Sequence, residues 1–492
     1  MPTLTIDGTQ VTVKEGTSVI NAAEEAGIYI PRYCYHPGLT VAGSCRMCLV
    51  EIEGMPKLQI SCHMTAQEGM KVRTVTDMVK RARQAMLEFL LSNHPLDCPV
   101  CDQSGECDLQ NFYMDYGLYD SRFLENKRKG KKAVPIGPHV MLDQERCILC
   151  TRCVRFTNEV SKTYELSVIN RGSRSVIDMV PGKVLDNPYS GNVIDICPVG
   201  ALTEREFRFQ CRVWYLSEHD SVCPGCSRGC NISIHYNKRK AYKAGGRRVM
   251  RVKPVFNADI NKWWICDRGR FGYLFIDRNR IEQPCLKSES GQLAAGWDEA
   301  LTTASDLIKN ALDNQGASGI GVIFSPKQTN EELETAKKLF TETRGITHFS
   351  FINPWEEPGL EDDLLMKADS NPNTRGSSDL GLQGDTAEIL RKAADGELKL
   401  LIIFRHSFDS PEALELVNKA SRIIYIGTNW NETARQADVV LAGTVFAEKD
   451  GSFTNFEGKK QHFTQVFLPI AGSRDDTGIL EQLSGRMNTW TS

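Results

Sequence analysis

The chain has 492 residues, too many for a single hydrophobic core, and predicts three or four domains at roughly 100–200 residues each. Its hydrophobic fraction of 41% and charged fraction of 25% are ordinary for a soluble globular protein. A formal net charge of -3 gives no reason to expect nucleic acid or an anionic membrane as a partner.

The sequence predicts neither a signal peptide nor a membrane-spanning helix. The opening MPTLTIDGTQVTV lacks the basic and apolar regions of a signal peptide, and no stretch approaches the ~20 apolar residues that span a bilayer. We therefore expect a cytosolic protein, or one that reaches a membrane only through a partner. The basic block at 127–132 (KRKGKK) is interpreted as a solvated loop, with docking to a partner as the alternative.

The first 78 residues predict a small α+β domain. Leu4–Ile6 and Val11–Val13 alternate in hydrophobicity and are joined through Asp7-Gly8, which indicates a β-hairpin. A helix capped by Thr17 or Ser18 should run to about Ala26, and a strand is expected at Leu49–Glu53. This order suits a ferredoxin-like (β-grasp) domain.

The next segments alternate between helix and loop. Residues 77–93 predict a helix, ended by Pro95, with one face shared by Val79, Ala82, Met86, Phe89 and Leu90. Strand-then-helix units follow residue 290, at Gly319–Phe324 with Asn330–Phe340 and at Leu398–Phe404 with Pro411–Ala420. These units predict an α/β domain with a mostly parallel sheet. The expected domains are 1–78, 79–120, 140–210, 215–275 and 290–492.

Seventeen cysteines are the most informative feature, because disulfides are rare in a reducing compartment and clustered cysteines there indicate metal or catalysis. All but Cys211 and Cys285 fall into four groups before residue 267. For these two, a buried free thiol is expected.

The first group predicts a [2Fe–2S] cluster. Such a cluster needs four thiolates, usually from one wrapping loop and one distant residue. The pair CRMC, preceded by Gly43, supplies backbone amides free to point at sulfur. Zinc is the alternative, since four thiolates also satisfy a tetrahedral site. The expected ligands are Cys34, Cys45, Cys48 and Cys62.

The second group lies in HPLDCPVCDQSGEC, just after the helix. One histidine completes a set of four with three cysteines and predicts a [4Fe–4S] cluster. A neutral imidazole in place of a thiolate should make the cluster easier to reduce. A zinc knuckle is the alternative. The expected ligands are His94, Cys98, Cys101 and Cys107.

The third group is half of a two-cluster ferredoxin pattern, C-x2-C-x2-C-x3-C-P, in which each triad borrows its fourth ligand from the other repeat. The triad CILCTRC is followed by Thr157 where a cysteine would stand. Downstream, a Cys-Pro pair has Asn187, Ser190 and Val193 in place of its own triad. One [4Fe–4S] cluster is therefore expected, on Cys147, Cys150, Cys153 and Cys197.

The fourth group combines C-x2-C-x3-C with a distant cysteine. This spacing suits either a [4Fe–4S] cluster or zinc. The expected ligands are Cys223, Cys226, Cys230 and Cys266. The four groups together predict one [2Fe–2S] and two or three [4Fe–4S] clusters.

Five stretches closely resemble the family of G subunits of bacterial respiratory complex I (NADH:quinone oxidoreductase), the counterparts of the mitochondrial 75 kDa subunit. They are YCYHPGLTVAGSCRMCLVEIEG, NHPLDCPVCDQSGECDLQ, CILCTRCVRF, DICPVGAL and WWICDRGRFGY, and they cover residues 1–275 almost continuously. The resemblance implies a [2Fe–2S] cluster at the first group and [4Fe–4S] clusters at the second and third. At the fourth it implies an extra cluster, present in some members and thought to lie off the main electron path.

The C-terminal part resembles the molybdopterin oxidoreductase fold, in SPKQTNEE, NPNTRGSSDLGL and AEKDGSFTNFEGKKQ. In the family this domain is a non-catalytic remnant, and an end at residue 492 makes it shorter than usual. The fold class expected is thus multidomain: a β-grasp domain, loop-rich [4Fe–4S] domains and a truncated α/β domain.

The function implied is electron transfer from an NADH/FMN subunit towards quinone-reducing clusters, with no substrate site of its own. Implied partners are the NADH/FMN-binding subunit, a [2Fe–2S] thioredoxin-like subunit and quinone-side subunits of the peripheral arm, with no nucleic acid and no membrane span. The implied location is peripheral, at the cytoplasmic face of the inner membrane. Alternatives are a cluster subunit of a soluble NAD-linked hydrogenase or formate dehydrogenase, or a zinc-stapled scaffold. No nucleotide-binding glycine loop is visible, so NADH oxidation is assigned to a partner.

Overall fold

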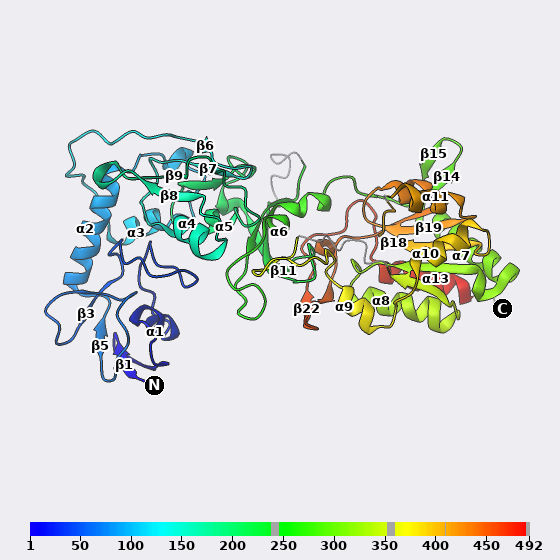
Figure 1. Cartoon of the computed structure of the whole chain (residues 1–492), viewed down its shortest axis with the longest axis horizontal. Coiled ribbons are helices and arrows are strands. Elements are labelled where there is room, and N and C mark those ends of the chain that lie inside the picture. Colours follow the sequence, from blue (N-terminus) through cyan, green and yellow to red (C-terminus); the bar gives the residue numbers. More distant parts are fainter. Residues whose placement is uncertain (238–245, 352–359, 409, 489–492) are drawn as a thin grey trace. The chain divides into compact units, whose positions relative to one another are not determined.

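A computed structural model describes residues 1–237, 246–351, 360–408 and 410–488. The chain divides into two compact units, unit 1 (Met1–Leu216) and unit 2 (Ser217–Ser492) (Figure 1). The finer division into five domains stays a prediction. Within the described ranges, no helix is both long and apolar enough to cross a bilayer.

Unit 1 begins with a mixed five-stranded sheet. The expected hairpin is confirmed: Asp7 and Gly8 have positive φ angles of 46° and 88°, which suit a tight turn between antiparallel strands. Helix α1 (Val19–Glu25) begins at Ser18, whose hydroxyl accepts a hydrogen bond from the amide of Asn21. In spatial order the strands are β2 (Thr9–Thr12), β1 (Thr3–Ile6), β5 (Lys71–Arg73), β3 (Leu49–Ile52) and β4 (Gln59–Ile60).

Helix α2 (Asp77–Asn93) has the expected bounds. Val79, Arg83 and Leu87 are its buried residues, whereas Phe89 is 72% exposed. Arg83 is tolerated inside because its guanidinium donates to the Tyr116 hydroxyl and to the Leu49 carbonyl. An arginine with two hydrogen-bond partners therefore shares the buried face of the helix with Val79 and Leu87.

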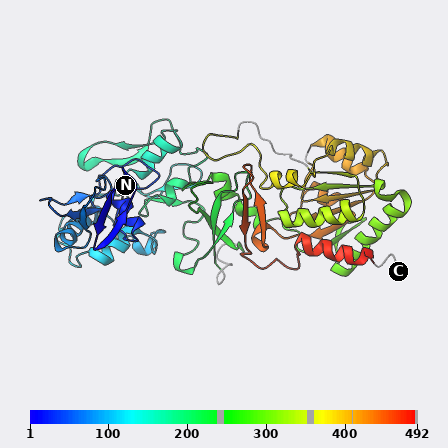
Figure 2. The same ribbon diagram turned by 90° about the horizontal axis from the view of Figure 1, so that it is seen from below.

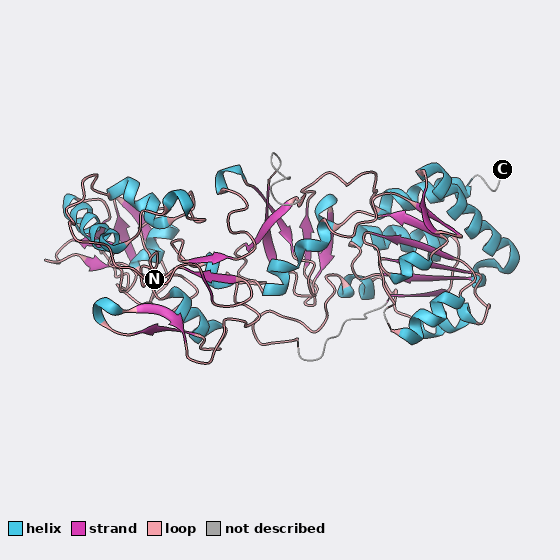
Figure 3. Cartoon of the chain, turned by 90° about the horizontal axis from the view of Figure 1, so that it is seen from above, coloured by secondary structure: helices cyan, strands magenta, loops and turns pink. Residues whose placement is uncertain are grey.

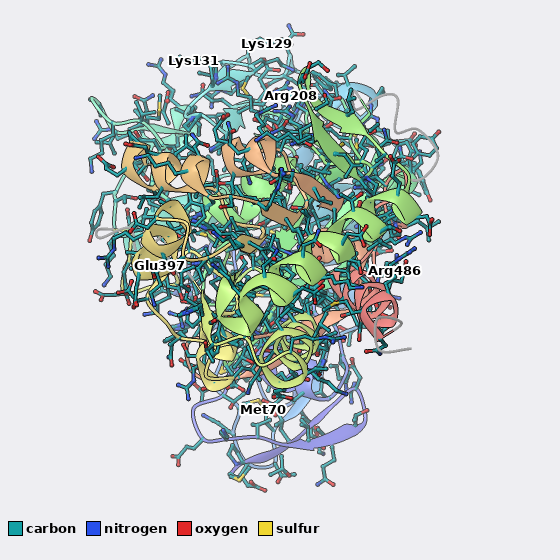
Figure 4. All side chains as sticks on the ribbon, turned by 90° about the vertical axis from the view of Figure 1, so that its right-hand side faces the viewer. Met70, Lys129, Lys131, Arg208, Glu397 and Arg486 are labelled. Atoms are coloured by element: carbon teal, nitrogen blue, oxygen red, sulfur yellow. The ribbon has the colours of Figure 1, made fainter. Side chains whose placement is uncertain are left out.

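The rest of unit 1 consists of short elements joined by long loops, drawn in pink in Figure 3. Strand β7 pairs with β6 and β10, and β8 pairs with β9. Lys129 and Lys131 of the basic block point outward (Figure 4). The bounds are α3 (Asp108–Tyr116), β6 (Val134–Pro135), β7 (Val140–Leu142), α4 (Arg152–Arg155), β8 (Leu166–Ile169), β9 (Val176–Met179), α5 (Asn192–Asp195) and β10 (Leu202–Glu204).

Unit 2 opens with a three-stranded antiparallel sheet and a short helix that follows it. The central strand pairs with both of its neighbours, and the helix packs against the third strand. Their bounds are β11 (Ser217–Val222), β12 (Asn231–Tyr236), β13 (Val249–Pro254) and α6 (Asp267–Phe271).

The second sheet of unit 2 is a seven-stranded α/β sheet, and five of its strands are parallel, as expected. Its strand–helix units match those predicted from the sequence. In spatial order the strands are β15 (Gly291–Ala294), β14 (Cys285–Ser288), β20 (Val439–Ala442), β19 (Ile423–Gly427), β18 (Leu400–Phe404), β16 (Ile320–Phe324) and β17 (His348–Phe351).

Helices cover both faces of this sheet, so its strands are apolar throughout. One face packs against α7 (Trp297–Gln315), α8 (Asn330–Lys337) and α13 (Asp476–Asn488). The red α13 and the orange α11 lie on opposite sides of the sheet in Figure 2. The remaining elements are α9 (Thr374–Asp379), α10 (Thr386–Ala394), α11 (Pro411–Lys419), α12 (Glu432–Gln436), β21 (Gly451–Thr454) and β22 (Lys460–Phe463).

Candidate metal centres

Site 1 consists of Cys34, Cys45, Cys48 and Cys62, which the loops around β3 and β4 bring together. The amide of Cys34 lies 3.5 Å from the Cys45 sulfur. Ser61, next to Cys62, donates from its hydroxyl to the Cys48 carbonyl at 2.8 Å. All but Cys45 are buried. The structure thus brings the two sequence-distant cysteines of the set against the CRMC pair.

The thiols of site 1 compete for protons. The side chain of Cys45 lowers the pKa of Cys34 to about 5, and that of Cys62 lowers the pKa of Cys48 to about 7. In each pair the other thiol has a raised pKa, first because of its facing cysteine and then because of burial. Four thiolates cannot coexist here without a compensating positive charge, which iron would supply.

Site 2 consists of His94, Cys98, Cys101 and Cys107. His94 is the C-cap of α2, and Cys107 is the residue before α3. His94, Cys98 and Cys107 line one pocket. Burial raises the pKa of Cys107 to about 11.

The His94 ring is buried and held in its neutral form. Burial, followed by the positive charges of Arg146 and Lys127, lowers its pKa to about 4. Its Nδ1 atom is buried and has no hydrogen-bond partner among the described residues. An imidazole that is neutral, buried and unpaired fits a metal ligand better than a solvated side chain.

Site 3 consists of Cys147, Cys150, Cys153 and Cys197, and all four line a single cavity. The remaining lining is apolar apart from Thr151 and Arg152.

The backbone of site 3 is wound tightly around this cavity. Leu149 and Thr151, which alternate with the cysteines, have φ angles of 54° and 60°, in the left-handed region that such residues rarely adopt. The amide of Leu149 donates to the Cys147 sulfur at 3.4 Å. Burial raises the pKa of Cys147 and of Cys197 to about 12, so both thiols stay protonated until a cation binds.

The positions of the lost second ferredoxin triad carry a hydrogen-bond network instead. Asn187 donates from its side chain to the buried Glu165 at 2.6 Å, and Thr163 donates to the same carboxylate at 2.6 Å. Thr157 donates from its hydroxyl to the Val154 carbonyl. These contacts give the substituted residues a structural role.

Site 4 lies in unit 2 and consists of Cys223, Cys226, Cys230 and Cys266, all buried. Cys266 is the N-cap of α6 and its sulfur accepts from the Gly269 amide at 3.4 Å. A Cβ on Gly269 would stand 3.0 Å from the Cys223 sulfur, so the helix backbone packs closely against that thiol. Burial, and then Cys226, raises the pKa of Cys266 to about 12.

Sites 2 and 3 are in contact within unit 1. The Pro198 carbonyl, next to Cys197, accepts from the Asp108 amide at 3.0 Å, next to Cys107. A Cβ on Gly200 would lie 2.2 Å from the Cys101 sulfur. The segment that supplies the last ligand of site 3 therefore forms one wall of site 2.

Tyr33 lies between sites 1 and 2 and was not anticipated. Its side chain is fully buried, its ring packs on Phe112 at a centroid distance of 5.2 Å, and its hydroxyl has no partner in the described parts of the chain. Its pKa is raised by burial first and then by Cys107, Asp108 and Cys45. An orphaned hydroxyl beside thiols of two sites fits sulfur acceptors that arrive with a cluster.

All four groups thus assemble, and their role as ligands stays a prediction. No three cysteine, histidine, aspartate or glutamate side chains in the described segments are placed as a ligand set for a single metal ion. Cys211 and Cys285 are buried and lie outside the four sites.

Comparison with known families matches five parts of the chain. Residues 1–77 match a 2Fe-2S iron-sulfur cluster binding domain, and 83–122 match the NADH-ubiquinone oxidoreductase-G iron-sulfur binding region. Residues 137–203 match the ferredoxin-like domain of NADH-quinone oxidoreductase subunit 3. Residues 216–278 match a molybdopterin oxidoreductase Fe4S4 domain, and residues 363–486 match the molybdopterin oxidoreductase family. The chain therefore contains 2Fe-2S and 4Fe-4S binding domains.

Individual relatives extend this similarity over the whole chain. The G subunit of the NADH-quinone oxidoreductase of Rickettsia conorii is 31% identical over 98% of this chain and 87% of its own length. The NADH-ubiquinone oxidoreductase 78 kDa subunit of Candida albicans is 45% identical over 99% of this chain and 82% of its own. Among solved structures, an NAD+-reducing [NiFe]-hydrogenase chain is 33% identical, over 43% of this chain and 91% of that one, with a TM-score of 0.39.

Several other relatives are much longer than the part that matches. The match spans 46% and 50% of the G subunits of Rickettsia bellii and Rickettsia felis, and 37% of that of Streptomyces coelicolor. The chain thus spans about half of these relatives or less.

Proposed function

Because the chain belongs to the family of NADH-quinone oxidoreductase G subunits and their 75–78 kDa counterparts, we propose that it is an electron-transfer subunit of respiratory complex I. Its sixteen predicted ligands would hold one [2Fe–2S] cluster at site 1 and [4Fe–4S] clusters at sites 2 and 3, with a third [4Fe–4S] cluster or zinc at site 4. When bound, such clusters supply one-electron acceptors and donors.

The observation that carries the proposal is the arrangement of site 3. Its four cysteines, separated in the sequence, line one cavity whose other walls are mainly apolar. Buried thiols with raised pKa values release their protons only to a strongly bound cation, and left-handed residues between them set the loop before any cluster binds. This combination favours a resident cluster.

The protein's own residues would position the clusters, shield them from water and adjust their reduction potentials. Burial of the sulfurs keeps water away from the metal, and backbone amides such as that of Leu149 stabilise thiolate charge. Gly200 and Pro198, which follow the last predicted ligand of site 3, lie against Cys101 and Asp108 of the site 2 segment. This packing supports passage of electrons between the two sites.

Partners and location follow from the proposed complex. NADH oxidation would belong to an NADH/FMN-binding subunit, next to a [2Fe–2S] thioredoxin-like subunit, and electrons would leave to quinone-side subunits of the peripheral arm. The protein would sit at the cytoplasmic face of the inner membrane, held there by those subunits. The names of its full-length relatives support complex I over a soluble hydrogenase or formate dehydrogenase.

Replacing one predicted ligand tests the proposal. In the assembled complex, Cys150→Ala should remove one [4Fe–4S] signal from the low-temperature EPR spectrum and abolish electron transfer from NADH to quinone. Cys285→Ala, which removes a buried thiol outside the four sites, is the control and should keep both. Normal turnover in Cys150→Ala would refute the proposed route.

A further inference from the structure

Two arginines of the CTRCVRF segment tie site 3 to the loop of site 1. Arg152 donates to the Tyr35 carbonyl at 2.6 Å and to the Ile196 carbonyl at 3.1 Å, so it joins the neighbours of Cys34 and Cys197. Arg155 also reaches the site 1 loop, donating to the Thr40 carbonyl. The bonds to Tyr35 and Thr40 link residues more than a hundred positions apart.

Arg155 makes the more direct link. One of its terminal nitrogens, Nη2, donates both to the Cys34 carbonyl and to the Cys150 carbonyl, the latter at 3.2 Å. Cys34 is a predicted ligand of site 1, and Cys150 a predicted ligand of site 3. A single guanidinium group is therefore shared by the backbone of two cluster sites.

The charges around this link are mainly positive. Arg152 and Arg155 lie together here, and Arg32 lies over the Tyr35 ring, with 5.5 Å between its Cζ atom and the ring centroid. The nearby carboxylate of Glu159 is bonded to the amide and hydroxyl of Thr40.

We propose that Arg155 is a positioning residue shared by sites 1 and 3, whose positive charge raises the reduction potentials of both clusters together. The inference rests on the proposed function. Each cluster that takes one electron from a reductant gains one negative charge. A fixed, partly buried cation beside both ligand loops stabilises that charge at either site.

Two variants separate charge from structure. Arg155→Gln removes the positive charge, and Arg155→Lys keeps it while losing the planar fork that reaches both carbonyls. Arg174→Gln removes the same charge from an exposed position of unit 1 and is the control. The measurement is an EPR-monitored redox titration of the intact complex, reduced with dithionite, with iron and acid-labile sulfide determined on the same samples.

Arg155→Gln should lower the potentials of the site 1 and site 3 clusters, so that the ratio of reduced to oxidised cluster at a given potential falls several-fold. A tenfold fall corresponds to about 59 mV. The signals of sites 2 and 4 should keep their potentials. Arg155→Lys should restore most of the shift, and Arg174→Gln should cause none.

Unchanged potentials in Arg155→Gln, with all clusters present, would overturn the inference and leave the proposed function standing. A change of reduction potential at only one of the two sites would show that Arg155 does not act on both clusters. Equal shifts in Arg155→Gln and Arg155→Lys, or equal loss of clusters in both, would assign Arg155 a purely structural role. A wild-type protein without iron and sulfide would instead refute the proposed function.

Discussion

Gly200→Ala is expected to damage site 2 selectively. The new Cβ would stand 2.2 Å from the Cys101 sulfur and 3.1 Å from the Cβ of Gln103, whereas ordinary van der Waals contact begins at 3.4 Å. The sulfur must therefore move by more than an ångström. Overpacking of this kind costs about 1–3 kcal/mol, and metal–ligand distances tolerate only about 0.2 Å. Loss of the site 2 cluster should follow, with site 1 preserved.

Low-temperature EPR of the reduced complex, with iron and sulfide analysis, measures the outcome of Gly200→Ala. Gly485→Ala is the matched control, because a Cβ there meets no atom within 4 Å. A Gly200→Ala protein with every cluster signal intact and unchanged stability would refute the packing of the 197–200 segment against Cys101.

Three further predictions address other sites. His94→Cys should keep a cluster but lower its potential, because a thiolate adds negative charge; an unchanged potential in a redox titration would mean that His94 is not a ligand. Cys230→Ala should remove the site 4 cluster and its iron while NADH-to-quinone transfer continues; loss of transfer would contradict its position off the main path. Glu448 lies 2.7 Å from both Arg248 and Arg280; burial raises its pKa, but the two arginines outweigh burial and hold it below 4.5. The Glu448 carboxylate therefore stabilises the fold above pH 4.5, and this stabilisation is lost as the pH falls through the lowered pKa. Glu448→Gln should lower the free energy of unfolding at pH 7 by about 3–5 kcal/mol. It should also make that free energy depend less on pH in the acid range. Urea unfolding followed by tryptophan fluorescence checks this, and equal stability at pH 7 would contradict it.

Local patterns in the sequence predicted the local structure well. The Asp7-Gly8 turn, the cap at Ser18 and the strand–helix units of the α/β sheet depend on neighbours in the chain, and the structure confirms them. Cysteine spacing predicted four groups of ligands; the four cysteines of site 3 line one cavity, and the role of all four groups as ligands stays a prediction.

Long-range contacts explain what the sequence could not show. Arg83 can lie on the buried face of α2 because Tyr116 and Leu49 accept hydrogen bonds from its guanidinium group. The hydrophobic pattern of the helix gives no sign of these two partners. Arg155 meets Cys34 across 121 positions, and Gly200 meets Cys101 through a segment of another site. For Arg155, the available signal was the pair of arginines in CTRCVRF, one between the two cysteines and one after them, which a spacing argument ignores.

The most direct test of the account is the cofactor content of the whole chain, purified anaerobically. Iron and acid-labile sulfide should be present in ratios that match one [2Fe–2S] and two or three [4Fe–4S] clusters, with separate EPR signals on reduction. A colourless protein with zinc in stoichiometric amount, or with these cysteines joined as disulfides, would contradict it.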